Sequence, residues 1–215
     1  MKRIKIIILS IVFIVILSII GVTYFKSRWE RAQLPKPVQI NISNQPMMGN
    51  PRARIQFVIF EDLKCSNCAR FNNTILPSLK QKYINTGMAN YIMINVAFIP
   101  GSLPAANAAR CIYAQQPELF FPFVDYLYQH QPPENQDWAT VPALMNMASR
   151  IKGVNVDQLG VCILKNTYNQ LIMDNLKQAS QIMHNTVQTP SLYVNGIRIH
   201  DLNQSEIDKT VNLVK

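Results

Sequence analysis

An apolar run that leads directly into two closely spaced cysteines is the feature that most restricts the fold of this chain. Residues 55–60 form the run, and Cys65-Ser66-Asn67-Cys68 follows at the start of a predicted helix. A helix N-terminus carries partial positive charge and unpaired N–H groups, and both stabilise a thiolate, the reactive form of cysteine. Two thiols at this spacing can close a disulfide across one helical turn or pass it to another protein. The pattern therefore predicts a redox-active pair at a strand–helix junction.

Other interpretations of the Cys65/Cys68 pair remain open. Half of a zinc site would need two more ligands, and the remaining cysteines and histidines form no second closely spaced pair. An inert structural disulfide is a further alternative. Two unrelated buried thiols are disfavoured, because strand-to-helix junctions are exposed and rich in sites. We expect no metal, and no cofactor other than the Cys65–Cys68 disulfide itself.

Residues 6–25 form an apolar run of twenty without a charge, which is long enough to cross a bilayer as a helix. Lys2, Arg3 and Lys5 precede it, as in a signal sequence. A cleaved signal has a shorter apolar region and a small-x-small cleavage site, and neither is evident here. Residues 1–31 are therefore predicted to be an uncleaved signal anchor with its flanks. A cleaved signal, which would leave a soluble periplasmic protein, is the alternative.

The charges that flank residues 6–25 are nearly balanced, so the positive-inside rule does not decide the orientation. Two other features place the following domain outside the cytoplasm. The apolar segment is N-terminal, as in exported proteins, and the chain carries four cysteines whose best use is oxidised. We expect a single-pass protein of the bacterial inner membrane, with its domain in the periplasm or extracytoplasmic space.

The net charge of +9 does not indicate a nucleic-acid partner. Residues 1–31 hold six of the Lys and Arg residues and one acidic residue, and the rest of the chain has fifteen basic against eleven acidic residues. No basic run with interleaved aromatic residues is present, which argues against nucleic-acid binding.

Hydrophobic periodicity and turn residues predict the order of the elements. Residues 32–51 are rich in proline and are expected to be a tether, although residues 38–42 alternate like an edge strand. Asn195-Gly196 predicts a tight hairpin turn. The expected elements are strand 54–60, helix 65–85 bent or split at Pro77, strand 89–97, a helical block over 103–183, strands 191–194 and 197–200, and a closing helix over 202–214.

A strand–helix–strand unit followed later by two strands and a helix is the arrangement of a thioredoxin fold. The fold class is therefore α/β: a thioredoxin fold interrupted by an all-helical insertion, with an N-terminal transmembrane helix. The predicted thioredoxin-like domain is discontinuous, because residues 52–102 and 184–215 flank the insertion at 103–183.

Four segments resemble the DsbA-like thiol–disulfide oxidoreductases. Residues 60–68 resemble the family's strand-to-active-site junction, and residues 189–196 are similar to its Thr-Pro segment with the following strand and hairpin. Residues 105–111 and 123–128 resemble the start of its helical insertion. The resemblance covers residues 38–213. It is specific, because a C-x-x-C pair is combined with a Thr-Pro pair and an Asn-Gly hairpin.

The resemblance implies roles for individual residues. Cys65 is expected to be the exposed nucleophile and Cys68 the resolving cysteine, with a cis Thr189-Pro190 peptide beside Cys65. Pro190 belongs to the expected catalytic set, and the residues expected to touch substrate are Thr189, Ser66 and Asn67. The resemblance also implies a structural disulfide between Cys111 and Cys162, with two buried free thiols as the alternative.

Two departures from the family pattern concern the strength of the oxidant. Ser66 and Asn67 stand where many relatives have proline followed by histidine or tyrosine, which predicts a less acidic Cys65 and a less oxidising disulfide, partly offset by Lys64. Relatives often have a glutamate six residues before the first cysteine, where this chain has Ile59. The nearby Glu61 and Asp62 are expected to be solvated loop carboxylates.

The predicted function is exchange of the Cys65–Cys68 disulfide with cysteine-containing exported proteins, in the direction of disulfide formation. A membrane redox partner would reset the enzyme. One alternative is an envelope disulfide reductase or isomerase. The other, from a different class, is a non-catalytic thioredoxin-like scaffold or chaperone in an envelope assembly.

Overall fold

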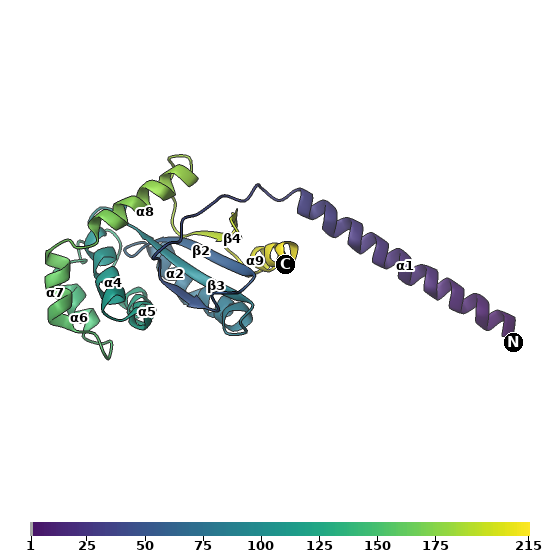
Figure 1. Ribbon diagram of the computed structural model, residues 1–215, viewed down its shortest axis with the longest axis horizontal. Helices are drawn as coiled ribbons and strands as arrows, with labels where there is room; N and C mark the ends of the chain where they lie inside the picture. The colour runs from purple at the N-terminus through teal and green to yellow at the C-terminus, as the bar shows by residue number, and fades with distance from the viewer. Residues whose placement is uncertain (1) are drawn as a thin grey trace.

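The computed structural model describes residues 2–215 and has a central five-stranded sheet with strand order β1-β3-β2-β4-β5 (Figure 1). The central strands β2 (Ile55–Asp62) and β3 (Ala89–Val96) are parallel and in register from Ile55 opposite Ala89 to Asp62 opposite Val96. The other pairings are antiparallel and add β1 (Met47–Gly49) beside β3, β4 (Ser191–Val194) beside β2, and β5 (Ile197–Arg198) beside β4.

Both faces of the sheet are covered, which explains why β2 and β3 are apolar almost throughout. Side chains such as Phe57 and Tyr91 point into the larger core. Their neighbours Val58 and Ile92 point into a second cluster, which includes Ala179 of α8 (Asn169–Ile182). The sheet order and the helices on both faces agree with the thioredoxin-like α/β fold predicted from the sequence.

The segment after the cysteines is split, as the proline predicted. α2 (Ser66–Thr74) ends before Ile75, and α3 (Leu76–Leu79) begins there and continues into the π-helical turn η1 (Lys80–Ile84). Pro77 lies in the first turn of α3, where a missing N–H costs no helical hydrogen bond.

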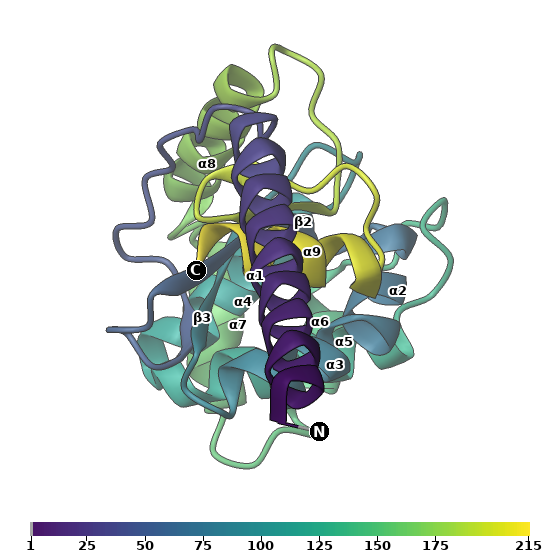
Figure 2. The ribbon, with the colours of Figure 1, turned by 90° about the vertical axis from the view of Figure 1, so that its right-hand side faces the viewer.

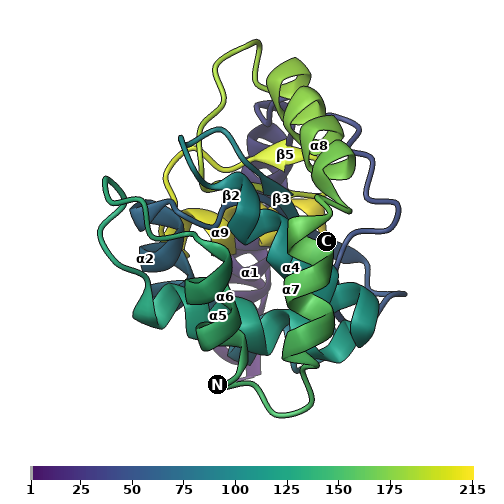
Figure 3. The same cartoon turned by 90° about the vertical axis from the view of Figure 1, so that its left-hand side faces the viewer.

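The helical block between β3 and β4 lies on the side of the domain opposite α1 (Figure 3). Its helices, besides α8, are α4 (Leu103–Gln115), α5 (Phe120–His130), α6 (Val141–Ala148) and α7 (Val156–Leu164), and the short turn η2 (Pro117–Leu119) separates α4 from α5. A disulfide joins Cys111 of α4 to Cys162 of α7, with an S–S distance of 2.04 Å. It closes a sequence separation of 51 residues within this block.

The proline-rich segment between α1 and β1 is docked on the domain, and the edge strand predicted at 38–42 was wrong. Asn41 exchanges two hydrogen bonds with Gln178 of α8, at 2.6 and 3.2 Å. The edge strand forms later, at β1, where Gly49 has a φ of +91°. A Cβ at Gly49 would lie 2.7 Å from the carbonyl oxygen of Ala89, so glycine allows β1 to approach β3.

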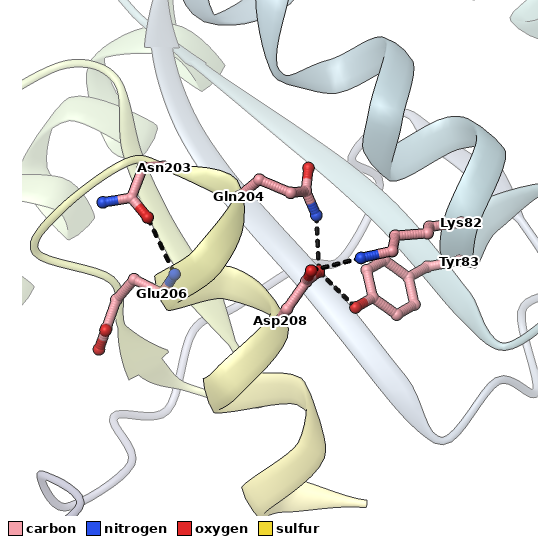
Figure 4. A network of polar contacts seen from close by, with 6 residues as sticks. All are labelled: Lys82, Tyr83, Asn203, Gln204, Glu206 and Asp208. Atoms are coloured by element: carbon pink, nitrogen blue, oxygen red, sulfur yellow. Dashed lines mark hydrogen bonds and ion pairs between the residues drawn. The ribbon is translucent and has the colours of Figure 1, made fainter.

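The C-terminal hairpin forms one edge of the sheet, and a helix follows it. Asn195 and Gly196 both have positive φ, as the predicted tight turn requires. Helix α9 (Gln204–Val214) starts at Asn203, whose side chain accepts a hydrogen bond from the N–H of Glu206 (Figure 4). Asp208 of α9 accepts hydrogen bonds from Tyr83, Gln204 and Lys82, which ties α9 to η1 (Figure 4).

Helix α1 (Lys2–Ala32) extends away from the sheet domain as a single long rod (Figure 1). In the view of Figure 2 the same helix lies in front of the domain. Its segment Ile11–Ala32 is long and apolar enough to cross a membrane, and no part of it is buried in the domain. A signal sequence near the N-terminus has the same length and composition.

Candidate active site

The loop that presents the first cysteine is held by the last residue of β2. Oδ1 of Asp62 accepts from the N–H of Lys64, and Oδ2 accepts from the N–H groups of Phe98 and Ile99 and from Ser102 Oγ, at 2.8 to 3.0 Å. Asp62 is therefore buried and structural. It joins the loop after β2 to the loop after β3, and the prediction of a solvated carboxylate was wrong. Burial raises its pKa, and these hydrogen bonds oppose the rise.

Cys65 and Cys68 differ in acidity, and only Cys65 lines a cleft. Both side chains are buried, so the expectation that Cys65 is exposed was wrong. Cys65 is the N-cap residue of α2 and is 5% exposed, whereas Cys68 is fully buried within the helix, and both are free thiols. The pKa of Cys65 is lowered to about 6, chiefly by the hydrogen bond from Cys68, with smaller contributions from Thr189 and from the N–H groups of Cys68 and Asn67. Burial opposes this shift. Burial raises the pKa of Cys68, and so does the hydrogen bond between its thiol and Cys65. Glu61 and Cys65 raise it further when they carry negative charge.

The peptide bond between Thr189 and Pro190 is cis. The Cys65 thiol lies 3.5 Å from the carbonyl oxygen of Thr189, to which it can donate a hydrogen bond. The structure therefore has the cis bond implied by the resemblance and places it beside the first cysteine. Because proline has no N–H, this backbone segment offers the sulfur no main-chain donor at Pro190.

Glu61 is a buried acid near the end of β2, and the prediction that it would be solvated was wrong. β2 continues two residues beyond the predicted strand end, so Glu61 pairs with Asn95 inside the sheet and is 0% exposed. Tyr128 of α5 donates a hydrogen bond to Glu61 Oε2 at 2.9 Å, while the buried Oε1 has no hydrogen-bond partner in the part of the chain that the structure describes. Burial raises the pKa of Glu61 to about 8, against the hydrogen bond from Tyr128. Glu61 therefore holds a proton at neutral pH.

A cleft of about 660 Å³ opens beside the first cysteine. It brings together residues far apart in the sequence: Cys65, Asn67 and Arg70 around α2, and Thr189 and Pro190 before β4. The cleft therefore contains four of the six residues predicted for catalysis and substrate contact. Cys68 lies below it, and Ser66 is exposed and lines a neighbouring cavity together with Lys64.

Two charged residues at the site, Glu134 and Lys64, form hydrogen bonds with residues that are distant in the sequence. Glu134, in the loop between α5 and α6, accepts hydrogen bonds from both the N–H and the hydroxyl of Ser66, at 2.8 and 2.9 Å. The ammonium group of the buried Lys64 donates to the carbonyl oxygen of Pro100 at 2.9 Å. Sequence analysis missed Glu134, because 68 residues separate it from Ser66 and no local pattern marks it.

Two cysteines with opposite pKa shifts, one facing a cleft and one sealed beneath it, are suited to accept a disulfide and pass it on. No group of three His, Cys, Asp or Glu side chains within residues 2–215 could hold a metal ion. The fold and the site together define a thiol–disulfide oxidoreductase with a thioredoxin fold.

Comparisons with known proteins agree with this class. A family model described as "Thioredoxin" matches residues 41–212. The chain is 30% identical to disulfide bond formation protein D of Bacillus subtilis over 80% of this chain and 78% of that protein. It is 31% identical to the probable disulfide bond formation protein D of Bacillus cereus over 91% of both chains.

Solved structures give the same result. The crystal structure of oxidised BdbD from Bacillus subtilis has a TM-score of 0.77 and 28% identity, covering 83% of this chain and 96% of that one. Chlamydia trachomatis DsbA has a TM-score of 0.74 at the same identity and coverage. This chain belongs to the thioredoxin family matched by the model, and within it to the DsbA-like thiol–disulfide oxidoreductases.

Proposed function

We propose that this oxidoreductase forms disulfides in exported proteins, with Cys65 as the residue that meets substrate and Cys68 as its internal partner. The observation that carries this assignment is the asymmetry of the pair: Cys65 lines the cleft and has a lowered pKa, while Cys68 is buried and has a raised one. A sulfur with a lowered pKa is the better leaving group in exchange.

The reaction begins from the oxidised enzyme. A substrate thiolate attacks the sulfur of Cys65, which breaks the Cys65–Cys68 bond and releases Cys68 with the electron pair. The second substrate thiol then loses its proton and attacks the substrate sulfur of the mixed disulfide, and Cys65 leaves as a thiolate. Two electrons pass from the substrate dithiol to the enzyme, which ends as a thiolate at Cys65 and a thiol at Cys68.

Glu61 is proposed as the proton donor for the departing Cys68. Its pKa of about 8 keeps it mostly protonated at neutral pH, and a negative charge on Glu61 would raise the pKa of Cys68 further, so the two groups lie close enough to interact. Because the raised pKa of Cys68 makes its thiolate unfavourable in the core, a nearby proton lowers the cost of breaking the disulfide.

Thr189 and Pro190 are proposed to hold the substrate chain, with Ser66 and Asn67 at the helix side. The backbone of Thr189 lies beside Cys65, in a position where an extended peptide could pair with it in the manner of an added strand. The exposed Asn67 side chain is available to the same substrate, and the exposed Ser66, whose hydroxyl donates to Glu134, lies beside it.

The protein is proposed to be anchored in the bacterial inner membrane through residues 6–25, with its catalytic domain outside the cytoplasm. The apolar helix α1 and the Cys111–Cys162 disulfide, which suits an oxidising compartment, support this location. A membrane redox partner is proposed to reoxidise Cys65 and Cys68 after each turnover. An intact N-terminus in the mass of the mature protein would support the anchor over a cleaved signal.

The test is oxidation of a reduced two-cysteine peptide by the oxidised full-length chain in detergent micelles. The proposal predicts that one equivalent of enzyme removes two hydrogens from one peptide, read by mass, and becomes reduced at Cys65 and Cys68. Cys65→Ala should abolish the reaction. As a control, the double variant Cys111→Ala/Cys162→Ala should retain it at a temperature where it is folded. A wild-type chain that leaves the peptide reduced would rule the oxidase function out.

A further inference from the structure

Glu134 reaches the active-site helix from a different part of the chain. It lies in the loop between α5 and α6, in the helical block, and its Oε2 accepts from the N–H and from the hydroxyl of Ser66, the first residue of α2. The same side chain lines both the cleft at Cys65 and the neighbouring cavity beside Lys64. Its carboxylate therefore belongs to the wall of the site.

The Cys65 thiolate and the Glu134 carboxylate both interact with N–H groups in the first turn of α2. The N–H groups of Asn67 and Cys68 stabilise the Cys65 thiolate, and the N–H of Ser66 is taken by Glu134. The partial positive charge at this helix end thus faces a carboxylate as well as a thiolate. Lys64 and Arg70 line the same cavities, but neither forms an ion pair with Glu134. Among the ion pairs of the described residues, none neutralises the negative charge of Glu134 directly.

We propose that Glu134 is a positioning residue that sets the oxidising strength of the Cys65–Cys68 disulfide. The negative charge of Glu134 destabilises the reduced state, because Cys65 then carries a second negative charge at the same helix end. It has no comparable effect on the oxidised state, in which Cys65 is neutral. Its hydrogen bonds to Ser66 meanwhile hold the start of α2. The negative charge of Glu134 therefore makes the Cys65–Cys68 disulfide a milder oxidant than it would be without that charge.

The effect is measured in the equilibrium with glutathione, which depends on the proposed exchange activity of Cys65 and Cys68. Two glutathione thiols reduce the disulfide to a Cys65 thiolate and a Cys68 thiol, releasing one glutathione disulfide and one proton. Glu134→Gln keeps an acceptor for Ser66 and removes only the charge. It should raise the equilibrium constant for reduction about threefold, as expected for like charges near a solvent-exposed surface, or about 14 mV. It should also lower the pKa of Cys65.

The variants separate charge from geometry. Glu134→Ala, which removes the charge and the hydrogen bonds, should shift the equilibrium in the same direction, whereas Glu118→Gln, at an exposed carboxylate in η2, should not change it. The shift of Glu134→Gln should shrink in 1 M salt, where charges are screened within about 3 Å.

Three results would overturn the inference: Glu134→Gln behaving like the wild type, a shift with Glu134→Ala alone, or a shift that salt leaves unchanged. These outcomes are distinct from failure of the proposed function, in which the wild-type chain would not exchange with glutathione at all.

Discussion

Replacing Glu61 by glutamine should change how the stability of the protein depends on pH. Glu61 is fully buried and accepts a hydrogen bond from Tyr128, and its Oε1 atom has no hydrogen-bond partner among the described residues. Burial raises its pKa from 4.5 to about 8 on folding. Between these two values the folded state holds a proton that the unfolded state has lost, so rising pH destabilises the fold. A glutamine fills the same space and does not titrate.

The size of the effect follows from the two pKa values. A difference of one unit corresponds to about 1.4 kcal/mol. Between pH 4 and pH 7 the unfolded chain ionises Glu61 almost completely, while the folded chain leaves it about nine-tenths protonated, since its pKa is about 8. The wild-type protein should therefore lose about 3 kcal/mol of unfolding free energy from this group over that interval. The Glu61→Gln variant should not.

Urea unfolding of the oxidised full-length chain in detergent measures this difference, followed by circular dichroism and by the fluorescence of the buried Trp138. The oxidised form keeps both disulfides closed. It removes the charge of Cys65 and leaves burial, the largest cause of the raised Glu61 pKa. The unfolding free energy of Glu61→Gln minus that of the wild type should rise by about 3 kcal/mol from pH 4 to pH 7. Other titrating groups cancel in this comparison. A difference that stays flat across this range would refute the argument that Glu61 is buried and protonated.

Three further predictions concern other parts of the molecule. In the reduced protein, thiolate absorbance and alkylation at Cys65 should titrate with a midpoint at about pH 6; a midpoint near 9 would contradict the hydrogen bonding described for its sulfur. The double variant Cys111→Ala/Cys162→Ala should lose about 4 kcal/mol of unfolding free energy, because the disulfide closes a sequence separation of 51 residues. Asp208→Asn should cost about 1 kcal/mol at pH 7, since the partly exposed Asp208 loses its ion pair with Lys82. Burial raises the pKa of Asp208 and its hydrogen bonds lower it by more, so its stabilisation is present above the unfolded pKa and is lost as the pH falls below 3.8; a cost that persists in acid would count against this.

Features encoded in short stretches of the chain could be predicted from the sequence. The hairpin at Asn195-Gly196 was found because type I′ turns need residues that tolerate positive φ. The split near Pro77 followed from the missing proline N–H. The strand–helix junction at Cys65 was evident because an apolar strand and the cysteine pair adjoin in the sequence.

Features that depend on distant contacts could not be predicted. Glu61 and Asp62 look like loop carboxylates in sequence, and only the extension of β2 and the approach of Tyr128 and the loop after β3 bury them. The segment 33–46 has the composition of a tether, yet amide side chains of α8 such as Gln178 hold it on the domain. Composition describes a segment in isolation, whereas contacts with distant residues determine whether these segments are buried or docked.

The most direct test of the central claim is which cysteine forms the covalent intermediate with a substrate protein. In the wild-type chain the second active-site cysteine resolves any mixed disulfide with substrate, so no intermediate accumulates. The two single variants are therefore compared after their remaining active-site thiol has been activated as a mixed disulfide with a small thiol. Full-length Cys68→Ala should accumulate a mixed disulfide that joins Cys65 to a substrate cysteine, identified by mass spectrometry after non-reducing digestion. Cys65→Ala should accumulate none through Cys68, because that sulfur is fully buried. Equal trapping by Cys65→Ala would contradict the assignment of Cys65 as the residue that exchanges with substrate.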